Sequence, residues 1–138
     1  MSEPRSLLSK LQVQSGYRLW LVNVPRDIAE ELSAGAEVEL VSGGEPHDGV
    51  LAFFDSSEEV KVLSDRILEG MAETGLVWVA YRKGTAGRAS GLSRDIGWEP
   101  LAEAGWRPVR QIAIDAEWSA LRFRPKHLVK AKPGSQFA

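Results

Sequence analysis

An apolar run that passes directly into a helix-like segment constrains this fold more than any other part of the chain. Residues 19–24 are apolar except for Asn23, which is the pattern of a strand covered on both faces. Pro25 suits the first turn of a helix, and the acids that follow it suit the helix N-terminal side. Such a strand–helix unit typically opens a nucleotide-binding α/β domain, whose loop carries glycines that approach a phosphate. Here the loop at residues 23–26 reads Asn-Val-Pro-Arg and has no glycine.

Apolar runs and helix-like segments alternate along most of the chain, and two strands close together follow them. This order predicts a three-layer Rossmann-like α/β sandwich, with a mostly parallel sheet, helices on both faces and a C-terminal antiparallel hairpin. We expect one domain over residues 1–125 and a flexible, Lys-rich tail over 126–138. The expected strands are 19–24, 37–41, 49–54, 76–81, 109–115 and 119–123. The expected helices are 6–11, one from residue 25, one that begins within 55–59 and continues to about 72, and 94–104.

Charge and composition exclude several classes of protein. The 138 residues carry a net charge of −2, which predicts no nucleic-acid partner, although a local basic patch is compatible with it. The chain has no cysteine, so disulfides and thiolate chemistry are excluded, and we expect a cytoplasmic protein. No apolar run is long enough for a bilayer, which predicts no membrane partner. The two histidines, His47 and His127, have no partner at metal-ligand spacing, so no metal is expected.

The segment after the strand at 76–81 is the best candidate for a binding site. Residues 82–93 read as a long polar loop rich in glycine and basic residues, at the edge of the sheet where α/β proteins bind ligands. Glycine amides together with cationic side chains would suit an anion. An ordinary solvated loop is the alternative. The candidate ligand-binding residues of this segment are Lys83, Arg88, Ser90 and Arg94.

Three further positions have a functional and a structural interpretation. Trp98 has polar neighbours and either lines a pocket for a planar ligand or packs in the core, as large aromatic residues usually do. Asp55 follows a buried strand and either faces a ligand or begins a helix. Arg122, Arg124 and Lys126 recur at strand alternation, so they lie either on a solvated edge of the last strand or on a partner surface.

Four phrases carry a resemblance to a known fold family: Gly49–Phe54, Gly75–Ala80, Leu101–Trp106 and Trp118–Pro125. They are similar to the fourth strand, the fifth strand, the helix after it and the seventh strand of a class I S-adenosylmethionine-dependent methyltransferase, in a shortened form. The chain also resembles a family of small bacterial proteins of unknown function over most of residues 6–125. This resemblance implies the fold and supplies no activity.

The chain departs from the methyltransferase pattern where the cofactor binds. The first loop lacks its glycines, and the second strand ends without the usual ribose-binding acid, although Glu39 lies two residues earlier. Asp55 stands where some methyltransferases place a substrate-facing acid or amide, but Ser-Ser follows it. If S-adenosylmethionine is held at all, the resemblance assigns it to Asn23 and Arg26.

We therefore predict an uncharacterised domain, non-catalytic or accessory, that binds a partner protein or a small anionic ligand at residues 82–94 and needs no cofactor. A divergent methyltransferase with S-adenosylmethionine is one alternative. A structural module that forms a homodimer through its C-terminal edge strand is the other, so the chain is expected to be a monomer or a homodimer.

Overall fold

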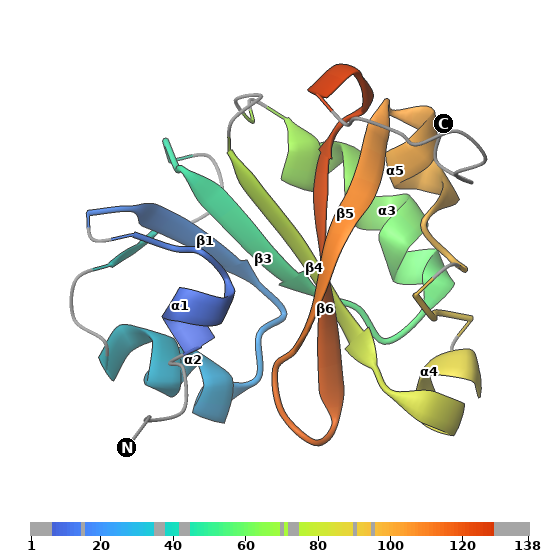
Figure 1. Ribbon diagram of the computed structural model, residues 1–138, viewed down its shortest axis with the longest axis horizontal. Helices are drawn as coiled ribbons and strands as arrows, with labels where there is room; N and C mark the ends of the chain where they lie inside the picture. The colour runs from blue at the N-terminus through green and yellow to red at the C-terminus, as the bar shows by residue number, and fades with distance from the viewer. Residues whose placement is uncertain are drawn as a thin grey trace.

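The computed structural model describes residues 7–14, 16–34, 38–41, 45–69, 71, 75–89, 91–94 and 96–128. These residues form a six-stranded sheet with the order β2-β1-β3-β4-β6-β5 (Figure 1). The strands are β1 (Arg18–Val22), β2 (Glu39–Val41), β3 (Gly49–Phe53), β4 (Leu76–Arg82), β5 (Trp106–Ala113) and β6 (Trp118–Pro125).

The strand directions confirm the predicted fold class. Strands β2, β1, β3 and β4 are parallel to one another, and β6 is antiparallel to both of its neighbours, β4 and β5. The sheet is therefore Rossmann-like and mostly parallel, with the expected antiparallel hairpin at its C-terminal side. In Figure 1 the carboxyl ends of the parallel strands point towards the bottom of the picture.

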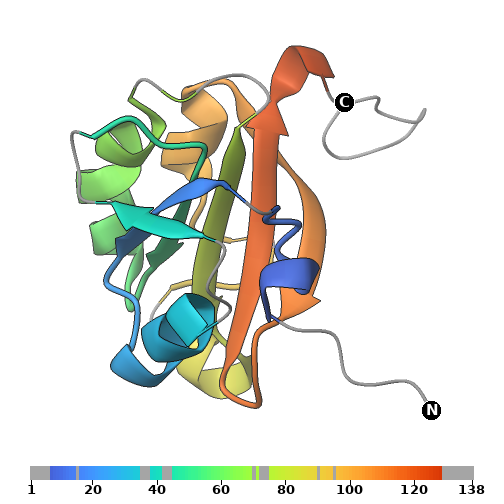
Figure 2. The same cartoon turned by 90° about the vertical axis from the view of Figure 1, so that its left-hand side faces the viewer.

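Helices cover both faces of the sheet. α1 (Leu7–Lys10) and α2 (Arg26–Ala34) lie on one side, and α3 (Ser57–Leu68) and α5 (Glu99–Glu103) lie on the other, as Figures 1 and 2 show. The short α4 (Gly84–Ala89) follows β4 at the carboxyl edge of the sheet. Ser56 caps α3, because its hydroxyl accepts a hydrogen bond from the backbone N–H of Glu59 at 3.2 Å.

The core is centred on β3 and β4, which are buried on both faces. On the α3 side, Val60 and Ile67 pack against the sheet, and on the α1 side Leu11 and Leu32 do so. Trp78 in β4 has no exposed surface, and its indole Nε1 donates to the carbonyl oxygen of Leu11 at 2.8 Å. This bond satisfies a buried donor and fixes the N-terminal segment to the middle of the sheet.

Two segments differ from the prediction. Residues 82–93 are not one long loop, because β4 extends to Arg82 and α4 occupies Gly84–Ala89. The glycines there lower helix propensity, so the sequence did not indicate the helix, which packs closely against the end of β4 at buried Gly87. The helix expected over 94–104 is shortened to α5, with Pro100 in its first turn.

The other boundaries agree within a few residues, with two exceptions near the C-terminus. Strand β6 is not an edge strand, since it lies between β4 and β5, and β5 is the edge. The predicted tail begins with a 3-10 turn, Lys126–Leu128, whose first N–H donates to the carbonyl of Gly105 at 2.7 Å. Within the described residues, no helix has the length and apolar character needed to cross a membrane.

Asp48 ties the amino ends of β1 and β3 together and gives the fold a pH-dependent contact. Its Oδ2 accepts a hydrogen bond from the backbone N–H of Arg18 at 2.8 Å, and the Arg18 Nε lies 3.4 Å from the same oxygen. The backbone bond from Arg18 is the main reason that the pKa of Asp48 is lowered; partial burial opposes it, and the Arg18 guanidinium reinforces it.

We expect Asp48→Asn to lower the free energy of unfolding by about 1 kcal/mol at pH 7, since this charge-assisted bond is partly exposed to solvent. A carboxyl whose pKa is depressed on folding contributes stability above its unfolded pKa of about 3.9 and loses it as the pH falls through the folded value. Urea unfolding of both proteins between pH 7 and pH 3 measures this difference. If the difference in free energy of unfolding between the two proteins does not become smaller at low pH, the stabilising role given to the Asp48 carboxylate is contradicted.

Candidate functional site

Proteins of this fold class usually bind their ligands at one point of the sheet, where the chain connections diverge. The chain passes from β1 through α2 to β2 on one side, and from β3 through α3 to β4 on the other side. Because these connections diverge, a crevice is expected outside the carboxyl ends of the adjacent strands β1 and β3. This position is the natural place for a cofactor, and the residues around it decide whether one fits.

Asn23 lies at this crevice, directly after β1. Its φ of 56° is in the left-handed region, which asparagine tolerates better than other non-glycine residues. Asn23 therefore makes the turn that a glycine makes in a cofactor loop, but it adds a side chain. The side-chain Nδ2 lies 3.5 Å from the carbonyl oxygen of Phe53, at the end of β3. The amide thus extends across the gap between the two strands.

The start of α2 is also poorly suited to a phosphate or a nucleoside. Pro25 has no backbone N–H to donate, so one of the orphan donors at the helix start is missing. Arg26 begins the helix and forms an exposed ion pair with Glu30, with 3.2 Å between Nε and Oε1. The two residues assigned to a divergent cofactor site, Asn23 and Arg26, are both exposed and both have partners within the chain.

The ribose-binding acid has no replacement in the described residues of β2. Glu39 is the first residue of that strand and pairs with Arg18 at the start of β1. It therefore lies at the amino edge of the sheet, opposite to the crevice, so the expectation that it could serve as that acid is wrong. Residues 42–44, which follow β2, lie outside the described part of the chain. The first loop has no glycine and the described residues of β2 place no acid at the crevice, so these described residues do not fit S-adenosylmethionine.

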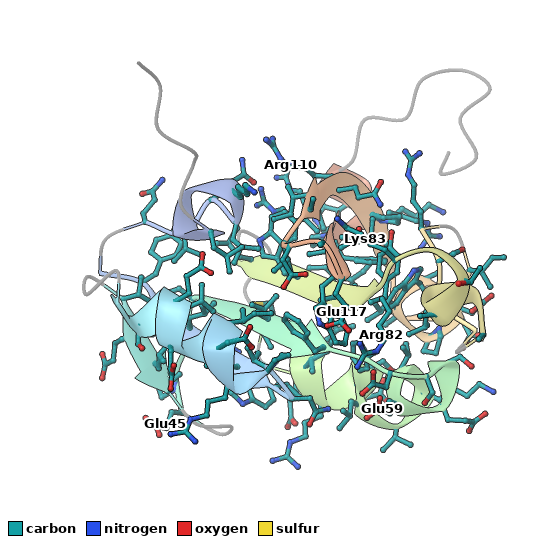
Figure 3. All side chains as sticks on the ribbon, turned by 90° about the horizontal axis from the view of Figure 1, so that it is seen from below. Glu45, Glu59, Arg82, Lys83, Arg110 and Glu117 are labelled. Carbon is teal, nitrogen blue, oxygen red and sulfur yellow. The ribbon has the colours of Figure 1, made fainter. Side chains whose placement is uncertain are left out.

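Arg82 organises the carboxyl edge between β4 and β6 (Figure 3). Its Nε lies 3.0 Å from Asp55 Oδ1, and its Nη1 lies 2.6 Å from Glu117 Oε1. The guanidinium also stacks over the indole of Trp118, with 4.4 Å from Cζ to the ring centroid. Burial alone would lower the pKa of Arg82, but the bond to Asp55 and the charge of Glu117 outweigh it and raise that pKa.

Asp55 therefore has a structural partner as well as its position at the end of β3. It does not cap α3, because Ser56 does, and the Asp55 backbone N–H donates to Glu59 Oε1 at 2.6 Å. The carboxylate of Asp55 is 66% exposed, so its second oxygen remains open to solvent. The sequence left open whether Asp55 begins a helix or faces a ligand, and the geometry adds the pairing with Arg82.

The remaining candidates of the segment 82–94 do not converge on one point in the described residues. Lys83 Nζ donates to the carbonyl oxygen of Asp115 at 2.5 Å, which directs it towards the β5–β6 hairpin (Figure 3). Arg94 is exposed. The side chain of Arg88 and all of Ser90 lie outside the described part of the structure, so their predicted roles stay predictions.

Trp98 packs in the core. It is 6% exposed, and its ring lies within about 6 Å of Phe54, Tyr81 and Phe123, with centroid distances of 6.1, 5.8 and 6.1 Å. Its indole Nε1 donates to the carbonyl of Ser93 at 2.6 Å. Of the two interpretations of Trp98, this geometry matches packing in the core and not a pocket for a planar ligand.

An open groove of about 1210 Å³ lies at the opposite, amino edge of the sheet. It runs between β1 and the C-terminal half of α3, with Trp20, His47 and Trp106 among its lining residues. The His47 ring packs against Trp20 at a tilt of 57°, with 5.4 Å between the ring centroids, and its Nδ1 lies 2.9 Å from the Glu45 carbonyl oxygen. The sequence did not indicate this groove, since its lining residues come from separate segments between Arg18 and Trp106.

The described residues contain no group of three or more His, Cys, Asp or Glu side chains arranged to hold a metal ion. His47 lies in the groove and His127 in the 3-10 turn, on separate elements.

Comparison with known proteins places the fold. No protein-family model and no curated protein matches the chain. An O-methyltransferase family 2 protein from Planctomyces limnophilus, solved with apigenin, has a TM-score of 0.56 at 16% identity and covers 86% of this chain and 44% of its own. The pyocyanin biosynthetic protein PhzM has a TM-score of 0.55 at 15% identity, over 87% and 54%.

A protein of the NADB-Rossmann superfamily from Streptococcus agalactiae has a TM-score of 0.51 at 11% identity, over 94% of this chain and 72% of its own. This chain spans about half the length of the O-methyltransferase family 2 protein and of PhzM. The fold therefore resembles that of class I S-adenosylmethionine-dependent methyltransferases, at an identity that establishes architecture alone.

Gly87 explains why the segment after β4 is rich in glycine. A Cβ at this position would overlap the carbonyl oxygen of Arg82 and lie 2.9 Å from that of Leu92. We expect Gly87→Ala to lower the free energy of unfolding by about 3 kcal/mol, as overpacking does. Gly84→Ala is the control, because that position has a φ of 63° but open space around it, and about 1 kcal/mol is expected. Chemical denaturation measures both, and equal losses would contradict the packing role.

Arg82→Met should remove two charge-assisted bonds and leave Asp55 and Glu117 without their cation. Because Arg82 is one-third exposed, we expect a loss of about 1–2 kcal/mol after allowance for solvent screening. Arg26→Met removes one fully exposed pair and should cost less than about 0.5 kcal/mol. Thermal unfolding of both variants tests the contrast, and an Arg82→Met protein as stable as wild type would show that the network contributes nothing.

Proposed function

We propose that this protein is a non-catalytic binding domain that keeps a methyltransferase-like scaffold, acts in the cytoplasm and does not use S-adenosylmethionine. The observation that carries the proposal is the position of Asn23. Its side chain extends across the carboxyl ends of β1 and β3, where the fold class would seat a nucleoside. Pro25 and Arg26 support the same conclusion. Anion sites use free backbone N–H groups at a helix start, but Pro25 has no N–H and the Arg26 side chain is paired with Glu30.

The proposed ligand is a partner or a small molecule that carries negative charge, as the basic residues 82–94 suggest. The geometry gives less support to Arg82 and Lys83 as the anion-binding residues of this segment. Arg82 already faces two carboxylates, and Lys83 already donates to a carbonyl. An incoming anion would meet Asp55 and Glu117 beside these cations. Among the described candidates, exposed Arg94 is the residue best placed to bind an anion there.

A homodimer through the edge of the sheet is less well supported. The edge strand is β5, and it carries Arg110 on its exposed middle section. Two copies paired antiparallel about that section would bring like charges together, which discourages edge pairing. We propose that the protein does not form a homodimer through β5 and is a monomer.

A divergent methyltransferase is the competing function, and one observation favours it. Asp55 lies at the carboxyl end of β3, and its carboxylate is mostly exposed. In that function, Asp55 would face the substrate, and Asn23 would have to move to admit the cofactor.

Thermal unfolding with S-adenosylmethionine and S-adenosylhomocysteine separates the two functions. Any ligand that binds only the folded state adds about 2.7 kcal/mol at a hundredfold excess over its Kd. We expect no increase in Tm with either compound, for wild type or for Asn23→Gly, because Pro25 and the missing acid remain in the variant. An increase for wild type contradicts the proposal. An increase for Asn23→Gly alone would contradict the role given to Pro25 and the missing acid and would leave the Asn23 side chain as the one block to the cofactor.

A further inference from the structure

Three arginines lie together on one face of the β5–β6 hairpin, and we call them the arginine cluster: Arg110, Arg122 and Arg124. Arg110 and Arg122 are directly paired across the ladder, and Arg124 is two residues from Arg122 along β6. Paired residues point to the same face of a sheet, and so do residues two apart. The three guanidinium groups therefore project from the same side of the hairpin.

This side is the one that α1 covers, away from the Arg82 network. Ala120 and Ile112, which share its alternation, belong to the core cluster beneath α1 and α2. Arg122 Nη1 donates to Gln12 Oε1 at 2.6 Å, just after α1. Lys10 in α1 lies beside the cluster, since its Nζ is 3.3 Å from the carbonyl of Ala113. Figure 3 shows Arg110 on the α1 side and Glu59 on the opposite side.

The cluster has no acidic counterpart in the described residues. The five ion pairs found there involve Arg18, Arg26, Lys61 and Arg82, and none involves these three arginines. The Nε atoms of Arg122 and Arg124 are buried and have no hydrogen-bond partner. Burial, and then the charges of Arg124 and Arg110, lower the pKa of Arg122. Cross-strand like charges destabilise a sheet, so the cluster costs stability in the isolated domain.

The sequence also concentrates positive charge in the C-terminal part of the chain, which includes β6. From residue 118 to residue 138 the chain contains five lysines and arginines and no Asp or Glu. The net charge of −2 is thus the sum of an acidic part before residue 118 and a basic C-terminal part. Such asymmetry along a chain is typical of binding to polyanions.

We infer that the arginine cluster is a binding surface for the phosphodiester backbone of single-stranded nucleic acid. A small ligand would need an enclosing cavity, and the large groove is lined by none of the three residues. A protein partner would need apolar anchors. Where side chains are described, the large exposed apolar ones are Leu40, Val62, Ile96 and Val109, and of these Val109 alone lies on the hairpin. A row of cations with few anchors suits a repeating phosphate, whose binding is almost entirely electrostatic.

The net charge of −2 predicted no nucleic-acid partner. A net charge does not show where the charges lie, so it did not indicate the basic patch on the hairpin. The inference rests on the proposed function only in taking the chain as a binding domain. Binding of S-adenosylmethionine is decided separately by Tm, so failure of one proposal leaves the other unaffected.

Fluorescence anisotropy with labelled twelve-nucleotide oligo(U) tests the surface. With three phosphate contacts, a salt slope of about −0.7 per contact predicts about a 20-fold loss of affinity between 50 and 200 mM salt. Arg110→Gln combined with Arg124→Gln should weaken binding at least about tenfold at 50 mM salt and flatten the slope by about 1.4. Arg122 is left in place because it bonds Gln12. Removing repelling charges should leave the Tm of this variant equal to or above that of wild type.

Lys61→Gln combined with Arg66→Gln is the matched control, since both side chains are exposed, lie on α3 and give the same change in charge. It should bind the oligonucleotide nearly as well as wild type. Equal losses in the two double variants would reduce the effect to net charge and overturn the inference. No binding by wild type would also overturn it, as would displacement of the oligonucleotide by polyglutamate as readily as by unlabelled oligo(U), which would indicate an acidic protein partner.

Discussion

The burial of β4 on both faces is the constraint on which the rest of the structure depends. A strand with apolar side chains on both sides must be covered twice, and here α1 and α2 do so on one side and α3 and α5 on the other. Trp78 strengthens the requirement, because its buried indole N–H needs an acceptor and finds one in Leu11. The parallel half of the sheet and the antiparallel hairpin join through this one strand.

The same central strand decides what the carboxyl edge can do. β4 continues to Arg82, which places a guanidinium among Asp55, Glu117 and the Trp118 ring. This network closes the edge between β4 and β6 with paired charges. At the neighbouring crevice, Asn23 makes a left-handed turn and extends its amide towards β3. A scaffold resembling that of the methyltransferases is thus kept, while the residues at its cofactor position serve the fold itself.

Charge is distributed unevenly around this scaffold. The carboxyl edge pairs its cations with acids, whereas Arg110, Arg122 and Arg124 lie on the hairpin without any among the described residues. Unpaired, mutually repelling arginines lower stability, and natural folds tend to keep such costs where function requires them. The groove at the amino edge, beside Trp20 and His47, is a third surface with a different, aromatic character.

The sequence determined the fold class and the character of the first loop. Long apolar runs such as 76–81 fix strands that are buried on both sides, and a loop without glycine is visible directly in the chain. Local patterns failed for α4, which forms in a glycine-rich segment where Gly87 packs closely against β4, and they left two interpretations of Trp98 open until packing placed it in the core.

Only the tertiary structure decided which charges meet. Arg82 is 27 residues from Asp55 and 35 from Glu117, and the three meet because β4 lies between β3 and β6. The register of the β5–β6 hairpin, which shifts between Pro108 and Arg110, sets Arg110 opposite Arg122. Such pairings depend on strand order and register, and strand order follows from how the whole chain covers its core. Residue spacing along the sequence does not contain that information, because the same spacing is compatible with many arrangements of strands.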